Sequence, residues 1–145
     1  MKHTFSTLDV FTSERFAGNP LAGVRDCDEL TDAQMQAGAR EFNLSETVFL
    51  MASERPAHSA KMRIFTPAAE LPFAGHPTIG TAIHIALENA DGKVDTDSLV
   101  VLEQKIGTVR VGVRLRDGQA PFAEFDTTKK TENLGDEPST ERISA

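Results

Sequence analysis

The segment from Pro77 to about Asn89 is apolar on nearly all sides, and it constrains the fold more than any other feature of the chain. Its large side chains include Ile79, Ile85 and Leu87, with small residues between them. A surface helix exposes a polar face, whereas a helix that is hydrophobic all round is buried. Because most of the remaining pattern predicts strands, we expect a central helix with a sheet wrapped around it.

Alternating and β-branched runs predict the strands of this sheet. Thr31 is a good N-cap for one further helix, which runs to about Phe42. The segment 16–21 contains Gly18, Asn19 and Pro20 and predicts a turn. The predicted fold class is therefore α+β. The predicted strands lie at 3–11, 21–24, 46–51, 60–66, 98–103, 107–115 and 121–126.

Composition limits the partners of this chain. Its 145 residues leave room for one domain of the usual ~100–200 residues. The net charge is −7, and there is no basic cluster beyond Lys129 and Lys130, which argues against nucleic acid and anionic membranes. No apolar run approaches the ~18–20 residues of a membrane span, and the N-terminus lacks the apolar region of a signal peptide. We therefore expect a soluble, cytoplasmic protein.

The single cysteine, Cys27, excludes an intrachain disulfide and offers no metal-ligand spacing. Asp26 and Asp28 flank it, and neighbouring carboxylates disfavour the thiolate that a nucleophilic cysteine needs. We therefore expect neither a catalytic cysteine nor a metal site.

His76 lies in a tight turn that opens into the buried helix. Gly75 permits a sharp turn and a close approach by another molecule, and Pro77 suits the first helical position. The next free amides, from Thr78 onward, would then point from the positive end of the helix dipole toward a carboxylate or phosphate. The pattern predicts an acid/base group beside an anion site. The alternative is an ordinary helix start in which His76 is a capping or packing residue.

Glu46 and Asn19 are further candidates. Glu46 opens an apolar strand, where partial desolvation would let a carboxylate both take and give a proton; the alternative is a solvated strand-end glutamate. Asn19 places an amide side chain in a fixed turn; the alternative is a plain turn residue. Glu70, Asp9 and Glu14 are weaker carboxylate candidates.

Four blocks of sequence resemble, in their order and spacing, the PhzF-like isomerases of phenazine biosynthesis. The blocks are Phe-Ala-Gly-Asn-Pro at 16–20, Asn-Leu-Ser-Glu-Thr at 43–47, Arg-Ile-Phe-Thr-Pro at 63–67 and Glu-Leu-Pro-Phe-Ala-Gly-His-Pro-Thr at 70–78. The likeness runs from Thr4 to about Ala145, but covers only the first half of such a protein. It implies the diaminopimelate-epimerase-like fold, which has two similar domains and an active site between them. Each domain is a curved mixed, largely antiparallel sheet around a central helix.

The resemblance also implies a cofactor-independent proton shift, an isomerisation or epimerisation, on a small carboxylate-bearing substrate. Glu46 matches the family's acid/base glutamate, and His76 would orient the substrate or move a second proton. A diaminopimelate-type epimerase is a further alternative, against which the missing catalytic thiols count. The expected catalytic residues are thus Glu46 and His76, and the expected substrate-binding residues are Asn19, Gly75, Pro77 and Thr78.

The end of the chain predicts a domain boundary. Residues 1–127 are expected to form an N-terminal domain, and 128–145 an interdomain linker with the start of a missing second domain; the alternative for this segment is a disordered tail. A site built between two domains would then be incomplete in this chain. The resemblance also implies that a closing strand is absent, so a sheet edge would be open to pairing with another copy, and we expect a homodimer. The alternative function is a non-catalytic truncated module that self-associates or binds a small anion or a partner domain.

Overall fold

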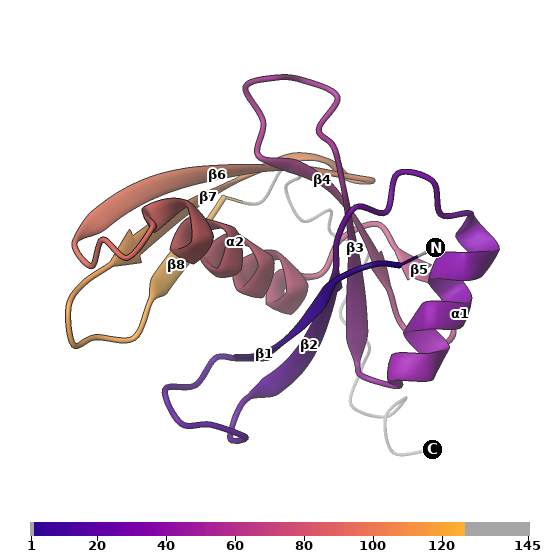
Figure 1. The fold of residues 1–145 in the computed structure, drawn as a ribbon, viewed down its shortest axis with the longest axis horizontal. Coiled ribbons are helices and arrows are strands. Elements are labelled where there is room, and N and C mark those ends of the chain that lie inside the picture. The colour runs from indigo at the N-terminus through magenta and orange to yellow at the C-terminus, as the bar shows by residue number, and fades with distance from the viewer. Residues whose placement is uncertain (1, 127–145) are drawn as a thin grey trace, which may run out of the picture.

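The computed structural model describes residues 2–126, in which one sheet curves around a central helix, α2 (Gly75–Ala90) (Figure 1). The α+β architecture predicted from the buried helix is confirmed. The expected linker and helix start at 128–145 lie outside the described residues, so the domain boundary stays a prediction. None of the helices within residues 2–126 has both the length and the apolar character needed to span a membrane.

The sheet has eight strands, and most of its ladders are antiparallel. In space the order is β1-β2-β3-β4-β6-β7-β8, and the short β5 pairs with β4. The two parallel ladders join β2 to β3 and β4 to β6. The strands are β1 (Phe5–Val10), β2 (Asn19–Val24), β3 (Glu46–Met51), β4 (Ala60–Phe65), β5 (Glu70–Leu71), β6 (Thr96–Gln104), β7 (Gly107–Leu115) and β8 (Phe122–Phe125).

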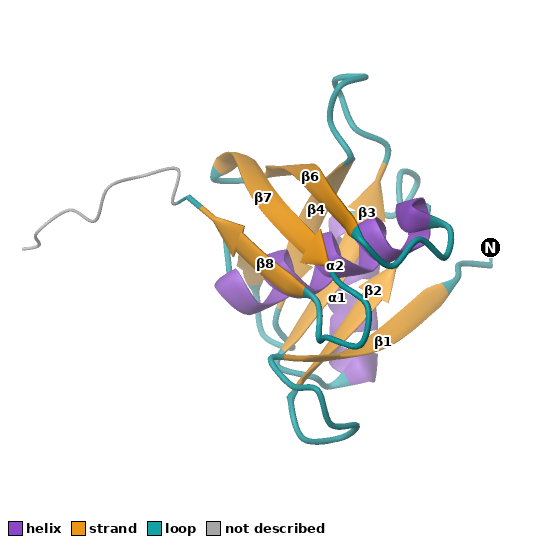
Figure 2. Cartoon of the chain, turned by 90° about the vertical axis from the view of Figure 1, so that its left-hand side faces the viewer, coloured by secondary structure: helices purple, strands orange, loops and turns teal. Residues whose placement is uncertain are grey.

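Because the sheet curves, α2 contacts β1 at one edge of the sheet and β8 at the other, as two perpendicular views show (Figures 1 and 2). Ala82 and Ala86 of α2 are completely buried, and Val48 of β3 and Leu102 of β6 are equally buried around the helix. Fully burying a valine or leucine side chain stabilises a fold by about 1.5–3 kcal/mol. The apolar surface of α2 is therefore what holds the two ends of the sheet together.

The other helix, α1 (Asp32–Phe42), packs on the opposite face of the sheet, where Met35 and Ala39 meet Phe49 and Phe65. Its predicted N-cap is confirmed. The Thr31 side chain accepts from the amide of Gln34, whose side chain accepts from the Thr31 amide in return. This capping box satisfies two amides that the helix itself leaves unpaired.

The structure differs from the sequence prediction mainly at element ends. Asn19 does not lie in a turn, because it is already the first residue of β2 and pairs with Val10. β5 was not predicted, since a strand of two residues is too short to show an alternating pattern. Helix α2 begins at Gly75 rather than at Pro77, with consequences for the site.

We expect the contact of α2 with β1 and β2 to tolerate no side chain at Gly80. A Cβ at this position would lie 2.7 Å from a methyl carbon of Val10 and 2.9 Å from one of Leu21. Overpacking of this kind costs about 1–3 kcal/mol, so Gly80→Ala should lower the free energy of unfolding measured by urea titration. The matched control is Gly23→Ala, where a Cβ would meet nothing within 4 Å. Equal stability of the two variants would contradict the packing argument.

Candidate active site

The side chains of His76 and Glu46 meet, although the two residues are thirty positions apart in the chain. His76 is the second residue of α2, and Glu46 is the first residue of β3. Nδ1 of His76 lies 2.9 Å from Oε2 of Glu46. The two side chains are only 9% and 19% exposed, respectively. The structure therefore unites the two predicted acid/base residues in one partly buried pair.

The other ring nitrogen of His76 faces the backbone of Asn19. Nε2 lies 3.1 Å from the Asn19 carbonyl oxygen. The strand register explains this placement, because β2 and β3 are parallel and Leu21 lies beside Glu46. Asn19 thus contributes its carbonyl group here. The substrate contact expected of its side chain stays a prediction.

The two contacts of His76 place different demands on its ring nitrogens. A carbonyl oxygen only accepts hydrogen bonds, so a hydrogen bond between Nε2 and the Asn19 carbonyl has Nε2 as its donor. Nδ1 is then the nitrogen that faces the Glu46 carboxyl group.

The helix start places its free amides earlier than the sequence predicted. The N-cap is Ala74, which makes Pro77 the third helical residue rather than the first, and the amide of Thr78 donates to the Ala74 carbonyl at 3.3 Å. The expectation that the free amides begin at Thr78 is therefore wrong. A helix leaves its first amides without intrahelical partners, and here those are the amides of Gly75 and His76.

Pro77 and Thr78 are buried. The Thr78 hydroxyl donates to the Ala74 carbonyl at 2.7 Å and accepts from Nε2 of Gln104 at 3.0 Å. These bonds fix the helix start against β6. The predicted contact of Pro77 and Thr78 with a substrate stays a prediction, and their burial does not favour it. Gly75 is partly exposed and has no positive φ, so it is not needed here for a left-handed backbone conformation.

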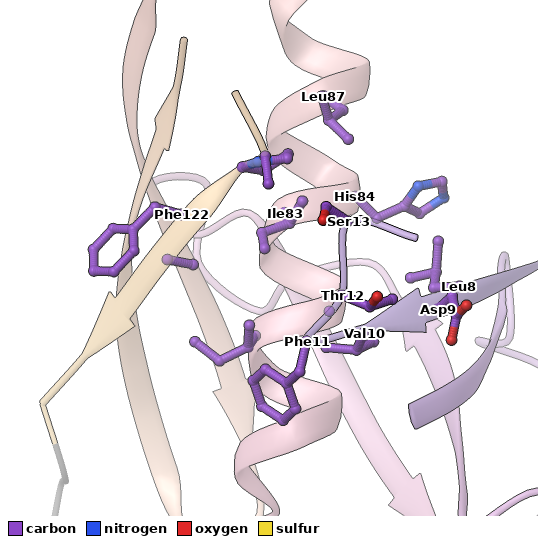
Figure 3. Close-up of a pocket in the computed structure, with 15 residues that line it drawn as sticks. Leu8, Asp9, Val10, Phe11, Thr12, Ser13, Ile83, His84, Leu87 and Phe122 are labelled. Carbon is purple, nitrogen blue, oxygen red and sulfur yellow. The ribbon is translucent and has the colours of Figure 1, made fainter. Parts of the chain in front are cut away.

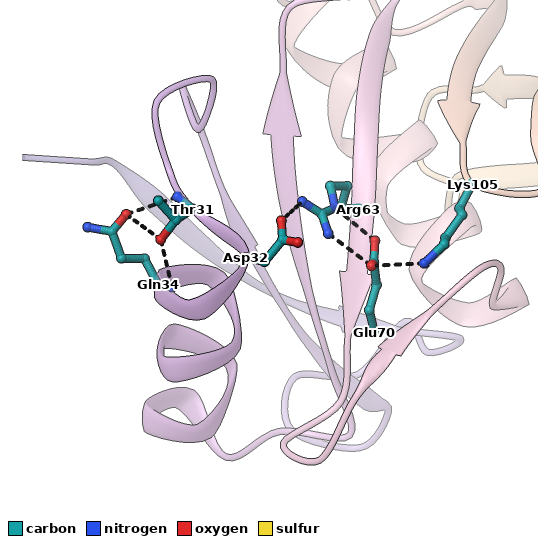
Figure 4. Close-up of polar contacts among 6 residues, drawn as sticks. All are labelled: Thr31, Asp32, Gln34, Arg63, Glu70 and Lys105. Carbon is teal, nitrogen blue, oxygen red and sulfur yellow. Dashed lines mark hydrogen bonds and ion pairs between the residues drawn. The ribbon is translucent and has the colours of Figure 1, made fainter.

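A network of charged side chains holds the segment that leads to His76 (Figure 4). Arg63 of β4 binds both carboxylate oxygens of Glu70, at 2.8 and 2.9 Å, and contacts Asp32 at 2.6 Å. Lys105 reaches Glu70 from the β6–β7 turn at 3.2 Å. A bidentate arginine–carboxylate pair fixes orientation as well as distance. Sequence reasoning identified Glu70 as a weak candidate but missed Arg63, its partner across the β4–β5 hairpin.

Arg63 is the main reason why the pKa of Glu70 is lowered from its ordinary value of 4.5, and Lys105 adds to the effect. A backbone hydrogen bond also holds the segment between Glu70 and α2. The carbonyl of Pro72 accepts from the amide of Ile106 at 3.1 Å. The charged network and this bond together anchor the peptide that precedes Gly75 and His76.

Cys27 and His84 do not join the pair. Burial, with smaller contributions from Asp26 and Asp28, raises the pKa of the Cys27 thiol to about 11. The sequence prediction that these carboxylates disfavour the thiolate is confirmed, although burial is the larger cause. Burial also lowers the pKa of His84, which lies in α2 with Nε2 3.6 Å from a carboxylate oxygen of Glu88. Within residues 2–126 no three His, Cys, Asp or Glu side chains are grouped to bind a metal ion.

An apolar groove lies over α2 and does not include Glu46 or His76 (Figure 3). It has a volume of about 570 Å³ and runs between β1 and β8, the two edge strands of the sheet. Phe11 links the groove to the pair, because its ring centre lies 6.1 Å from that of His76. The residues that define the groove are Leu8, Phe11, Ile79, Ile83, Leu87 and Phe122.

The chain is similar to known isomerases. The model of the PhzC-PhzF family, described as phenazine biosynthesis-like protein, matches residues 8–140. An uncharacterised isomerase of Mesorhizobium japonicum is 53% identical over 94% of this chain and 44% of its own length. The trans-2,3-dihydro-3-hydroxyanthranilate isomerase of Pseudomonas aeruginosa is 44% identical over 81% of this chain and 40% of its own length. This chain therefore spans less than half the length of these relatives.

A solved structure of a protein described as a predicted epimerase from Pseudomonas aeruginosa has the same fold. It superposes with a TM-score of 0.74 at 34% identity, over 86% of this chain and 43% of that one. The expected fold class, a curved mixed and largely antiparallel sheet around a central helix, is confirmed by this likeness together with the strand order above.

We expect Glu70 to stabilise the protein in a pH-dependent way. The pKa of Glu70 is lower in the folded protein than its ordinary value of 4.5. The ionised carboxylate therefore stabilises the folded protein above pH 4.5, and this stabilisation is lost as the pH falls through the folded-state pKa. Glu70→Gln should therefore lower the free energy of unfolding at pH 7 by about 1.5–3 kcal/mol, the usual contribution of a hydrogen bond to a charged group. The difference from wild type should shrink below pH 4.5 in urea titrations.

The control for this prediction is Glu54→Gln. This variant removes the ion-pair partner of Lys61, which lies on β4 as Arg63 does. The Glu54 side chain is 70% exposed, and exposed ion pairs contribute little. A difference between Glu70→Gln and wild type that does not change from pH 7 to pH 3 would contradict the assigned role.

Proposed function

The chain belongs to the phenazine biosynthesis-like family, and we propose that it forms the part of a cofactor-independent isomerase that moves a proton on a small, carboxylate-bearing substrate. Relatives in this family are named isomerases. The observation that carries the proposal is the 2.9 Å contact between Nδ1 of His76 and Oε2 of Glu46. A carboxyl group that a neighbouring imidazole holds in position in a partly buried site is suited to general acid–base catalysis.

Glu46 takes the substrate proton in the proposed mechanism. Its Oε2 is held by His76, which leaves Oε1 to abstract a proton from a carbon acidified by conjugation. The same oxygen returns the proton at another carbon. His76 keeps the carboxyl group oriented and exchanges a proton with it through Nδ1. Glu46 takes the proton in its ionised form, so its negative charge passes to the substrate as the carboxyl group forms, and the charge returns to Glu46 when the proton is given back.

The amides of Gly75 and His76 bind the substrate carboxylate in this proposal. They are the unpaired donors at the N-terminus of α2, where the helix dipole favours a negative charge. A carboxylate held there lies next to the acid/base pair, since His76 belongs to both. The name of the Pseudomonas aeruginosa relative supplies a substrate of this kind, trans-2,3-dihydro-3-hydroxyanthranilate, which is a ring bearing a carboxylate.

Glu46→Gln tests the acid/base role. The amide retains the size of the side chain but cannot accept a proton, so turnover should fall by at least about 10²-fold, the usual contribution of a general acid or base. The measurement is conversion of trans-2,3-dihydro-3-hydroxyanthranilate by the native gene product in D₂O, with deuterium incorporation followed by mass spectrometry. Glu41→Gln, on the exposed side of α1, is the matched control and should keep wild-type turnover.

Full turnover by Glu46→Gln would exclude Glu46 as the acid/base group. If wild type does not convert this compound, the assignment of that substrate fails. The role of the pair is then tested on other small carboxylates by the same deuterium incorporation.

The alternative is a non-catalytic module that self-associates, and the open apolar groove over α2 favours it. Leu87 lines this groove and is 49% exposed. If two copies pair through the groove, Leu87→Glu should convert a dimer to a monomer in sedimentation equilibrium, because a buried, unpaired charge is unfavourable. Val94→Glu, at a 52% exposed position outside the groove, should leave the dimer intact. A monomeric wild-type protein would contradict this alternative.

A further inference from the structure

The loop between β1 and β2 is held by a side chain that the proposed reaction does not use. Oδ1 of Asp9 accepts a hydrogen bond from the amide of Gly18 at 3.0 Å. Asp9 lies near the end of β1, and Gly18 immediately precedes Asn19, the first residue of β2. The contact therefore closes the loop directly before the carbonyl that faces His76.

The backbone at Gly18 comes unusually close to this carboxylate. A Cβ on Gly18 would lie 2.3 Å from the Val10 carbonyl oxygen and 2.8 Å from Oδ1 of Asp9. No side chain fits at those distances, so position 18 requires glycine for a close approach rather than for a positive φ. The β1 backbone at Val10 and the Asp9 carboxylate together therefore restrict position 18 to glycine.

Pro20 explains why a side chain is needed here. Asp9 pairs with Pro20 in the β1–β2 ladder, and proline has no amide hydrogen to donate. β2 therefore has no backbone donor at position 20. The bond from the Gly18 amide to Asp9 supplies a replacement anchor two residues before Pro20.

The two oxygens of Asp9 differ in their surroundings. Oδ2 is buried and has no hydrogen-bond partner among the described residues. Oδ1 is therefore the oxygen through which Asp9 holds the loop.

We propose that Asp9 is a positioning residue that holds the Asn19 carbonyl against Nε2 of His76 and thereby keeps a proton on that nitrogen. Asp9 accepts a hydrogen bond from the Gly18 amide, and the Asn19 carbonyl, two peptide groups further along the chain, faces Nε2 at 3.1 Å. With Nε2 protonated, only Nδ1 is left to exchange a proton with Glu46. The inference rests on the proposed function only in taking the Glu46–His76 pair as the proton-transfer group.

The test reads the ring nitrogens of His76 directly by ¹⁵N NMR of the labelled protein at pH 7. In wild type Nε2 should show the chemical shift of a protonated nitrogen. Asp9→Ala removes the acceptor for Gly18, so the ratio of protonated to unprotonated Nε2 should fall by about tenfold, the equivalent of one net hydrogen bond. Asp9→Asn keeps an acceptor oxygen of the same shape and should retain the wild-type signal.

The matched control is Asp28→Ala. Oδ1 of Asp28 accepts from the amide of Ala52 at 3.0 Å, which is the same kind of carboxylate-to-amide anchor elsewhere in the fold. This variant should leave the His76 nitrogens unchanged. If Asp9→Ala does not fold, Asp9→Ser, whose hydroxyl is too short to reach Gly18, carries the same expectation.

A wild-type Nε2 signal in a folded Asp9→Ala or Asp9→Ser protein would overturn the inference. So would an altered signal in Asp9→Asn or in Asp28→Ala, because the effect would then not depend on an acceptor at position 9. None of these outcomes requires turnover. Failure of the positioning role is therefore distinguishable from failure of the proposed reaction, which the activity of Glu46→Gln decides.

Discussion

Burial of α2 is the constraint on which the rest of the structure depends. The helix is apolar nearly all round, so a flat sheet could cover only one side of it, and the curved sheet covers more. Strands from both ends of the sheet contact α2. An unpaired polar group within the core is costly. At the N-terminus of α2 the side chain of His76 contacts both Glu46 and the Asn19 carbonyl.

The site follows from the sheet order around this helix start. The parallel neighbours β2 and β3 both begin beside it, so Asn19 and Glu46, their first residues, reach opposite nitrogens of one imidazole. A histidine held at both nitrogens has its ring orientation fixed before any substrate arrives. Preorganisation of this kind is what a catalytic pair needs, because little reorganisation then accompanies the proton transfer.

Two supports outside the pair hold this geometry from different directions. The Arg63–Glu70 network anchors the segment that leads into α2, and the Asp9–Gly18 contact anchors the loop that leads into β2. Both use a carboxylate, but their surroundings differ. Glu70 is satisfied by two cations, whereas Asp9 keeps one oxygen without a partner among the described residues.

The sequence by itself determined the features that depend on local pattern: the buried helix, the Thr31 cap, most of the strands, and Glu46 and His76 as acid/base candidates. It could not reveal the two-residue β5, the start of α2 at Gly75, or the burial of Thr78, which depend on contacts with distant segments. Only the tertiary structure decided that Glu46, His76 and the Asn19 carbonyl meet. The same is true of the contact between Asp9 and the Gly18 amide, next to Asn19. The physical reason is that periodicity and capping act over a few residues. Which strand ends lie side by side is decided by how the whole sheet buries α2.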